Sequence, residues 1–239
     1  IEIAIDVSDA AGLGVPARVS ASVVLPALET LPDRPVICVA MPSSSYARGY
    51  YTCDLPGAGR GSQAAFHVAR GWILVAIDWL GCDGACAIDP EDLGYAALTA
   101  AAHAAQAEIV LRLANGVLAP GYPPVRPACV IGIGQSLGGA LLIYQQARHA
   151  SFDGIAVLGF SAIHSHPPTP PGGNPVMVAW YPRDARIEEC REPVNAAALA
   201  SAAMPEQAAW ESVAWGFHYD DVPAEVVEQD LAHYEGIAH

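Results

Sequence analysis

Four short runs of wholly apolar residues constrain the fold of this chain more than any other feature. Strands that are buried on both faces have this composition, and such strands belong to parallel sheets covered by helices. The four runs are Val36–Met41, Trp72–Ile77, Ala128–Ile133 and Ile155–Phe160. The stretches between them that have a helical composition are Ser62–Arg70, Gly94–Ala114 and Leu137–His149. Strands that alternate with helices predict an α/β fold with a doubly wound, mostly parallel sheet flanked by helices.

The N-terminal residues have a different pattern, in which apolar and polar side chains alternate. Ile1–Val7 and Ala17–Leu25 both follow it. A period of two is typical of a strand with one buried face. Gly12, Gly14 and Pro16 separate the two segments and indicate a turn. We therefore predict an antiparallel N-terminal strand pair at one edge of the sheet.

The regular pattern ends after Phe160. A Pro/Gly-rich loop, Pro167–Pro175, precedes the short apolar run Val176–Tyr181. Three helix-like stretches follow: Asn195–Ala203, Pro205–Trp215 and Pro223–Tyr234. We expect residues 1–166 to form the core with strands one to six. Residues 167–239 are expected to form a helical lid, with the remaining core strands missing from this sequence.

Charge and composition narrow the classes of partner. The 25 acidic residues outnumber the 11 basic ones and give a net charge of −14, which disfavours nucleic acid and anionic membrane surfaces. No apolar run approaches the ~18 residues that span a bilayer, and no secretory signal pattern is present. We expect a cytoplasmic, bacterial protein with a small-molecule substrate, and a homodimer is left open. Cys82 and Cys86 lack a second Cys/His pair, so no metal is expected.

One motif carries candidate chemistry. Residues 134–138 spell Gly-Gln-Ser-Leu-Gly, which is G-x-S-x-G, directly between the run Ala128–Ile133 and the helical stretch Leu137–His149. A serine in so sharp a strand-to-helix turn needs small neighbours, because larger side chains would collide. The first N–H groups of the following helix would face a developing anion. This context favours Ser136 as a nucleophile over a set of glycines that merely pack a crossover.

The order of elements and this motif resemble the α/β-hydrolase fold superfamily from Ile1 to Phe160, about two-thirds of the chain. The resemblance implies a serine hydrolase, esterase-like, with Ser136 as nucleophile and no cofactor. It also implies an oxyanion hole made by the N–H of Leu137 and an N–H from the loop after the third strand. Ser43 or Ser44 is the candidate for that second donor. The loop departs from the family pattern, because Ala40-Met41 stands where His-Gly is commoner.

Three further residues are assigned from their positions near this motif. Asp78 begins a stretch, residues 78–84, that resembles the family's Asp-x-x-Gly-x-Gly loop, and we expect it to hold that loop together. Tyr46 and Gln135 are candidates for lining a pocket, with simple packing as the alternative for the tyrosine. The aromatic residues Trp180, Trp210, Trp215 and Phe217 in the expected lid favour an apolar substrate.

A serine nucleophile also needs a base and a carboxylate that orients it. The resemblance places these residues after a seventh and an eighth strand, and we expect them beyond His239. The alternative keeps them in this chain, with Val176–Tyr181 as the seventh strand, Asp184 as the acid and His218 as the base. No apolar strand separates Asp184 from His218, which disfavours this alternative.

The same scaffold supports more than one function, because a fold does not fix a reaction. Hydrolysis of an ester or related acyl bond is the first hypothesis. Acyl transfer, C–C bond hydrolysis and cofactor-free lyase or cyclase chemistry form the second. The third is a non-catalytic binding protein without a working triad.

Overall fold

The computed structural model describes residues 1–44, 46–54, 61–82, 88, 92–162, 164–165, 178–179 and 224–225. The described residues up to Phe160 belong to one compact unit, here called the first unit. Those from Ser161 to Glu225 belong to a second unit. The two units are described separately below.

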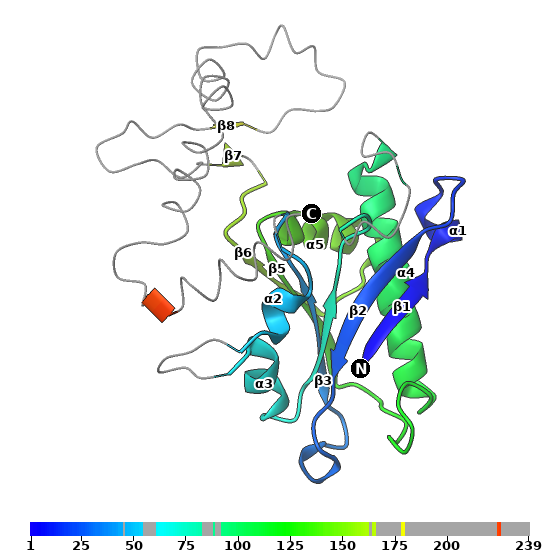
Figure 1. The fold of residues 1–239 in the computed structure, drawn as a ribbon, viewed down its shortest axis with the longest axis vertical. Helices are drawn as coiled ribbons and strands as arrows, with labels where there is room; N and C mark the ends of the chain where they lie inside the picture. The colour runs from blue at the N-terminus through cyan, green and yellow to red at the C-terminus, as the bar shows by residue number, and fades with distance from the viewer. Residues whose placement is uncertain are drawn as a thin grey trace, which may run out of the picture. The chain divides into compact units, whose positions relative to one another are not determined.

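The first unit is built on a six-stranded sheet (Figure 1). Its strands in chain order are β1 (Glu2–Asp6), β2 (Arg18–Val24), β3 (Val36–Met41), β4 (Ile73–Ile77), β5 (Cys129–Gln135) and β6 (Gly154–Leu158). Across the sheet the order is β1-β2-β4-β3-β5-β6. The four neighbouring strands β4, β3, β5 and β6 are parallel to one another. Strands β1 and β2 form an antiparallel pair, and β2 pairs antiparallel with β4. The predicted α/β class, with a mostly parallel sheet flanked by helices and an N-terminal antiparallel pair, is confirmed.

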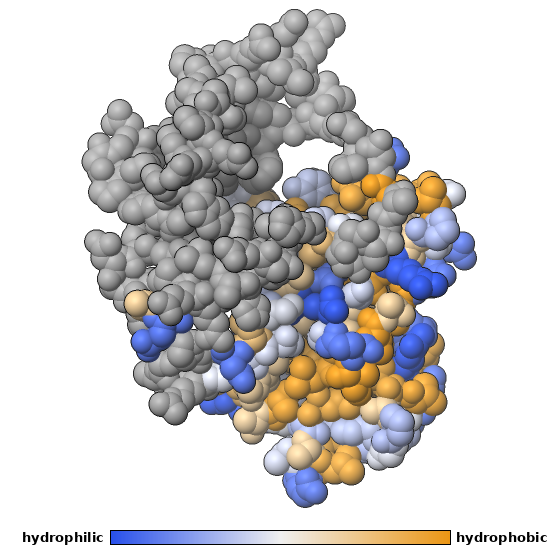
Figure 2. All heavy atoms as spheres, in the orientation of Figure 1, coloured by the Kyte–Doolittle hydropathy of each residue, from blue (hydrophilic) through white to orange (hydrophobic). Residues whose placement is uncertain are grey.

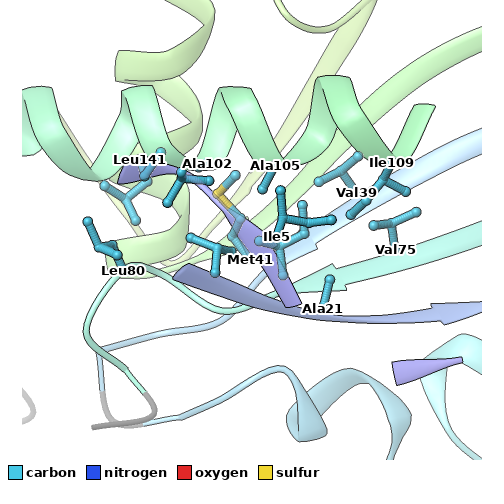
Figure 3. Close-up of a cluster of buried hydrophobic side chains, with 14 of the residues drawn as sticks. Ile5, Ala21, Val39, Met41, Val75, Leu80, Ala102, Ala105, Ile109 and Leu141 are labelled. Carbon is cyan, nitrogen blue, oxygen red and sulfur yellow. The ribbon is translucent and has the colours of Figure 1, made fainter. Parts of the chain in front are cut away.

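Helices cover both faces of this sheet. The elements are α1 (Ser8–Ala11), the 3₁₀ helix η1 (Leu28–Thr30), α2 (Gly49–Thr52), α3 (Gln63–Val68), α4 (Tyr95–Ala114) and α5 (Leu137–His149). Buried side chains of α1, α4 and α5 share one core cluster with the sheet, and those of α2 and α3 share the other. Figure 3 shows Ala102, Ala105 and Ile109 on the side of α4 that faces the sheet, where Met41, Val39 and Val75 lie. The three predicted helices are confirmed, whereas α1, α2 and η1 were not predicted.

Strand β3 shows how the sequence pattern produces these two layers. Val39 and Met41 belong to the cluster under α4 and α5, while Cys38 and Ala40 belong to the opposite one. Successive side chains of a strand point to opposite faces, so a strand covered on both sides must be apolar throughout. Burying one such side chain stabilises the fold by about 1.5–3 kcal/mol. Burial also raises the pKa of the Cys38 thiol to about 12, which keeps it neutral.

The sixth predicted strand differs from the expectation. It spans Gly154–Leu158 instead of Ile155–Phe160, and the prediction that it is buried on both faces is wrong. Ile155 is 36% exposed and Leu158 is 47% exposed. The reason is position, because β6 ends the strand order and pairs in the sheet only with β5 among the described residues. An apolar run therefore predicted the strand correctly but not its burial.

The second unit contains a two-stranded sheet in which β7 (His164–Ser165) pairs antiparallel with β8 (Val178–Ala179). The alternative that made Val176–Tyr181 a seventh strand of the main sheet is therefore wrong for its described residues, which pair elsewhere. Ala224 and Glu225 are helical, within the predicted stretch Pro223–Tyr234. The rest of the predicted lid lies outside the described residues, as do Asp184 and His218.

Apolar side chains also reach the surface of the first unit. Figure 2 shows them over part of its visible face, next to polar ones. Ile1, Leu28 and Val117 are 46%, 54% and 68% exposed.

In the described part of the chain, no helix combines the length and the apolar character needed to cross a membrane.

Candidate active site

Ser136 lies where β5 ends and α5 begins, at the strand-to-helix turn that the sequence predicted. Its backbone has φ 50° and ψ −115°. Its N–H donates to the Leu158 carbonyl at 2.8 Å, and its own carbonyl accepts the N–H of Ala140 at 3.1 Å. A residue other than glycine held in such a conformation costs about 1–3 kcal/mol, and strain of this size is concentrated at functional sites. The turn therefore has the strained geometry of a nucleophile elbow.

The hydroxyl of Ser136 is not used to stabilise the helix. Serine is a preferred N-cap residue because its oxygen can accept an N–H of the first helical turn. At the start of α5 the half-buried Ser136 side chain makes no such capping bond. The N–H of Leu137 also precedes the first hydrogen bond that closes the turn, that of Ala140. A hydroxyl and a helix N-terminus thus lie side by side without bonding to each other.

Two glycines allow the turn to pack backbone against backbone. A Cβ added to Gly134 would lie 2.7 Å from the nitrogen of Gly139. A Cβ added to Gly138 would lie 2.7 Å from the carbonyl oxygen of Pro42 and closer still to that of Met41. Both approaches are too short for any side chain. The close contact at Gly138 brings the loop after β3 against the first turn of α5.

This loop contains the two candidates for the second oxyanion donor. Ser43 is buried and Ser44 is exposed, and both directly follow the residues that contact Gly138. The carbonyl of Ser43 accepts the N–H of Tyr46 at 3.1 Å and the indole N–H of Trp79 at 3.4 Å. The first of these hydrogen bonds lies within the loop, and the second connects the loop to the end of β4. The structure brings Ser43, Ser44 and Leu137 to the same edge of the sheet as Ser136.

A buried ion pair fixes the far side of the same loop. Asp78 is 2% exposed and its carboxylate accepts the backbone N–H of Arg48 at 2.6 Å and a guanidinium N–H of the same residue. The Arg48 Nε also contacts Glu2 and Ser22, each at 3.1 Å. Burial alone would lower the pKa of Arg48, but the neighbouring Asp78 and Glu2 together outweigh it and raise that pKa. These contacts tie Asp78 to the loop after β3, whereas the prediction concerned residues 78–84, of which 83 and 84 lie outside the described residues. Arg48 was missed, although a buried carboxylate requires a cation.

The two predicted pocket residues have different surroundings. Tyr46 is 5% exposed, and its ring centroid lies 5.1 Å from that of Tyr50. Gln135 is half-buried beside Ser136, and its Oε1 is buried without a hydrogen-bond partner in the described part of the chain. Tyr46 is thus enclosed by packing, and Gln135 has an unused acceptor next to the elbow.

The three histidines whose side chains the structure describes lie away from Ser136. His149 is the last residue of the 13-residue helix α5, which at about 1.5 Å per residue puts it roughly 20 Å from the elbow. His103 stacks on His149 with ring centroids 4.3 Å apart. His67 stacks on Trp72, which precedes β4 and so lies at the opposite edge of the sheet. A base for Ser136 must therefore come from outside these residues.

Comparison with known proteins finds similar folds but no relative. No protein-family model matches the sequence, and no curated protein does. A probable hydrolytic enzyme from Pseudomonas aeruginosa PAO1 is 15% identical with a TM-score of 0.46, over 68% of this chain and 43% of that one. An N-acyl homoserine lactonase is 16% identical with a TM-score of 0.45, over 100% and 66% of the two chains. A proline iminopeptidase from Mycobacterium smegmatis is 16% identical with a TM-score of 0.47, over 93% and 67%.

The chain thus spans less than half of the first of these structures and about two thirds of the others. With TM-scores below 0.5, these likenesses carry no argument about this chain. What the site can do has to be argued from the geometry of Ser136 and its surroundings.

Proposed function

We propose that the protein is a serine hydrolase that cleaves an ester or a related acyl bond of an apolar small molecule. One observation carries the proposal: Ser136 has a strained backbone at the end of a strand, and its hydroxyl is not used to cap the helix that follows. A strained backbone costs free energy, and no capping bond accounts for the strain at Ser136, so another purpose must account for it. Presenting a nucleophile is the purpose that this turn favours.

The chemistry follows from the groups around the turn. The Ser136 oxygen attacks the acyl carbonyl carbon and passes its proton to a base, and the carbonyl oxygen becomes an oxyanion. The N–H of Leu137 and an N–H of Ser43 or Ser44 stabilise that charge, at about 3 kcal/mol of barrier per donor. The carbon–oxygen bond to the leaving alcohol breaks as the base returns the proton to it. Water then attacks the acyl-enzyme and gives a proton to the base. The bond between the acyl carbon and the Ser136 oxygen breaks, and the base returns the proton to that oxygen.

We infer that the base and its carboxylate lie outside the described residues; the sequence analysis expected them beyond His239, with Asp184 and His218 as the alternative. The substrate class rests on two features of the sequence. The aromatic side chains between positions 167 and 239 suit an apolar substrate. The net charge of −14 disfavours a phosphorylated substrate.

Turnover of p-nitrophenyl esters tests this proposal. Acyl chains from acetyl to decanoyl should be hydrolysed by the wild type with a preference for the longer, apolar ones, and not by Ser136→Ala. Mass analysis of the products, with an added alcohol as competing acceptor, separates hydrolysis from acyl transfer, since both pass through one acyl-enzyme. A folded protein without Ser136-dependent turnover of any ester in the series would contradict the proposal.

A further inference from the structure

Tyr51 reaches the site from the opposite face of the sheet to α5. It lies in α2, its side chain is completely buried, and it packs in the cluster formed with Cys38 and Ala40. Its hydroxyl donates to the carbonyl oxygen of Met41 at 2.7 Å. The backbone N–H of Gln135 lies near the same phenolic oxygen and lowers the pKa of Tyr51, against the larger effect of burial.

These two backbone groups come from the two strand ends that form the site. Met41 is the last residue of β3 and precedes the loop with Ser43 and Ser44. Gln135 is the last residue of β5 and precedes Ser136. In the parallel pairing of β3 and β5, Met41 is aligned with Gly134, the final pair of that ladder. The tyrosine hydroxyl thus lies where the pairing of the two strands ends, bonded to Met41.

We propose that Tyr51 is a positioning residue, whose hydroxyl fixes the oxyanion loop relative to the Ser136 turn. This inference rests on the proposed function, since it concerns the same site. Burying a phenol in a close-packed cluster requires a partner for its hydroxyl, and here that partner is the main-chain carbonyl of Met41, which precedes the oxyanion loop and lies against Gly138 in the first turn of α5. An oxyanion donor displaced by a fraction of an ångström loses much of its effect, because the stabilised charge exists only in the transition state.

Burial supports this assignment in a second way. It is the largest cause of a raised pKa of Tyr51, so the hydroxyl keeps its proton at every pH at which the fold is stable. A protonated hydroxyl keeps donating to the Met41 carbonyl. This hydrogen bond is therefore a fixed element of the site and not a titrating one.

The test compares Tyr51→Phe with a matched control, Tyr122→Phe. Tyr122 also donates its hydroxyl to a main-chain carbonyl, that of Pro26 at 3.2 Å. Each variant removes one oxygen and one such bond, but only the bond of Tyr51 is made at a strand end of the site. Four quantities are measured: kcat and KM for p-nitrophenyl butyrate, the inhibition constant of an alkyl trifluoromethyl ketone, and the melting temperature. The ketone forms a tetrahedral adduct with an oxyanion, so it reports on oxyanion stabilisation directly.

We expect Tyr51→Phe to lower kcat about tenfold and to weaken the ketone by a similar factor, with KM changed less than about twofold. Tyr122→Phe should leave all three constants unchanged while losing a similar amount of thermal stability. Replacing Tyr51 with p-aminophenylalanine, which keeps a donor for Met41, should restore kcat to within about threefold of the wild type.

Equal kcat in Tyr51→Phe and Tyr122→Phe would overturn the inference, as would a parallel change of kcat and KM. A Tyr51→Phe protein that does not fold would make the hydroxyl a structural group and would also overturn it. The wild type separates this result from failure of the proposed function. If the wild type neither turns over the ester nor binds the ketone, the proposed function falls and the inference falls with it.

Discussion

Two serines occupy the same kind of position in this protein and are used differently. Ser62 is the N-cap of α3, with φ −81° and ψ 162°, and its side chain accepts the N–H of Ala65 at 3.0 Å. Ser136 is the N-cap of α5, with φ 50° and ψ −115°, and it makes no capping bond. The first conformation lies in the extended region that N-caps usually adopt. The second lies where residues with side chains are strained.

The difference shows that residue type alone does not decide what a serine does. Ser62 stabilises a helix, because its extended backbone turns the hydroxyl back toward the helical N–H groups. Ser136 is held in its strained conformation by Gly134 and Gly138, which let main chain pack directly on main chain. The same hydroxyl is then left for a substrate. The predictions below test whether these two functions are separate.

The largest effect is expected for Ser136→Ala. Ester hydrolysis should fall by up to about a million-fold, toward the uncatalysed rate. The free energy of unfolding should change by less than about 0.5 kcal/mol, because no capping bond is lost. Initial rates with p-nitrophenyl butyrate and urea unfolding measure the two quantities. A variant that retained a large part of the activity would show that Ser136 is an ordinary helix cap.

Gly138→Ala tests what holds the elbow in place. Its new methyl group would meet the main chain of Met41 and Pro42, and the free energy of unfolding should fall by about 3 kcal/mol. Displacement of the loop should also lower kcat by about a hundredfold in the protein that remains folded. Gly154→Ala is the matched control, since a Cβ there meets nothing within 4 Å. Equal behaviour of the two variants would contradict the close packing.

Ser62→Ala should give the opposite result to Ser136→Ala. Losing the bond to Ala65 should lower the free energy of unfolding by about 1 kcal/mol. The kcat for p-nitrophenyl butyrate should stay at the wild-type value, because α3 begins away from the turn at Ser136. Urea unfolding and steady-state kinetics on the same preparation measure both. Loss of activity without loss of stability would mean that Ser62, too, belongs to the site.

A smaller effect on stability is expected when glycine replaces the two described residues other than glycine that have a positive φ, Ser136 and Ala150. Ala150, the C-cap of α5, has φ 47° and ψ 46°, which is the left-handed helical region. Ala150→Gly should stabilise the protein by about 1 kcal/mol and leave activity intact. Ser136→Gly should be more stable than Ser136→Ala by a similar amount, about 1 kcal/mol, while remaining inactive. If Ser136→Gly were no more stable, the turn would not be strained.

The smallest effect concerns pH. Burial lowers the pKa of His67 in α3, and it also lowers the pKa of His103, which stacks on the end of α5. A lowered pKa in the folded state means that the unfolded state binds protons more readily. The stability that these residues contribute is therefore complete above the ordinary histidine pKa of 6.5 and is lost as the pH falls. His67→Gln and His103→Gln should each flatten the fall in melting temperature between about pH 7 and 5. Unchanged slopes would contradict this.

Much of the first unit could be predicted from the sequence. Apolar runs such as Val36–Met41 and helical stretches such as Leu137–His149 have the same bounds in the structure. Their patterns are local, because the residues of the strand or helix itself are enough to predict it. The burial of β6 was not predictable, since it depends on which strands lie beside it. Short helices such as α1 and α2 have too few residues for a periodic pattern.

The candidate site, too, has a part that local sequence predicts and a part that depends on the folded structure. The G-x-S-x-G motif and its context predicted the turn at Ser136, because both glycines and the flanking elements are adjacent in the sequence. The partners that fix the turn come from elsewhere. Arg48 pairs with Asp78 across 30 residues, and Tyr51 of α2 donates its hydroxyl to Met41 at the end of a strand. No local pattern marks such residues.

The most direct test of the account is the intact mass of the protein after treatment with a fluorophosphonate. The account predicts one adduct on the wild type and on Ser62→Ala, and none on Ser136→Ala, because only Ser136 presents an activated hydroxyl. Peptide mapping should place the adduct on the peptide that contains Ser136. A folded wild type without any adduct, or an adduct that persists in Ser136→Ala, would contradict the central claim that this turn carries the nucleophile.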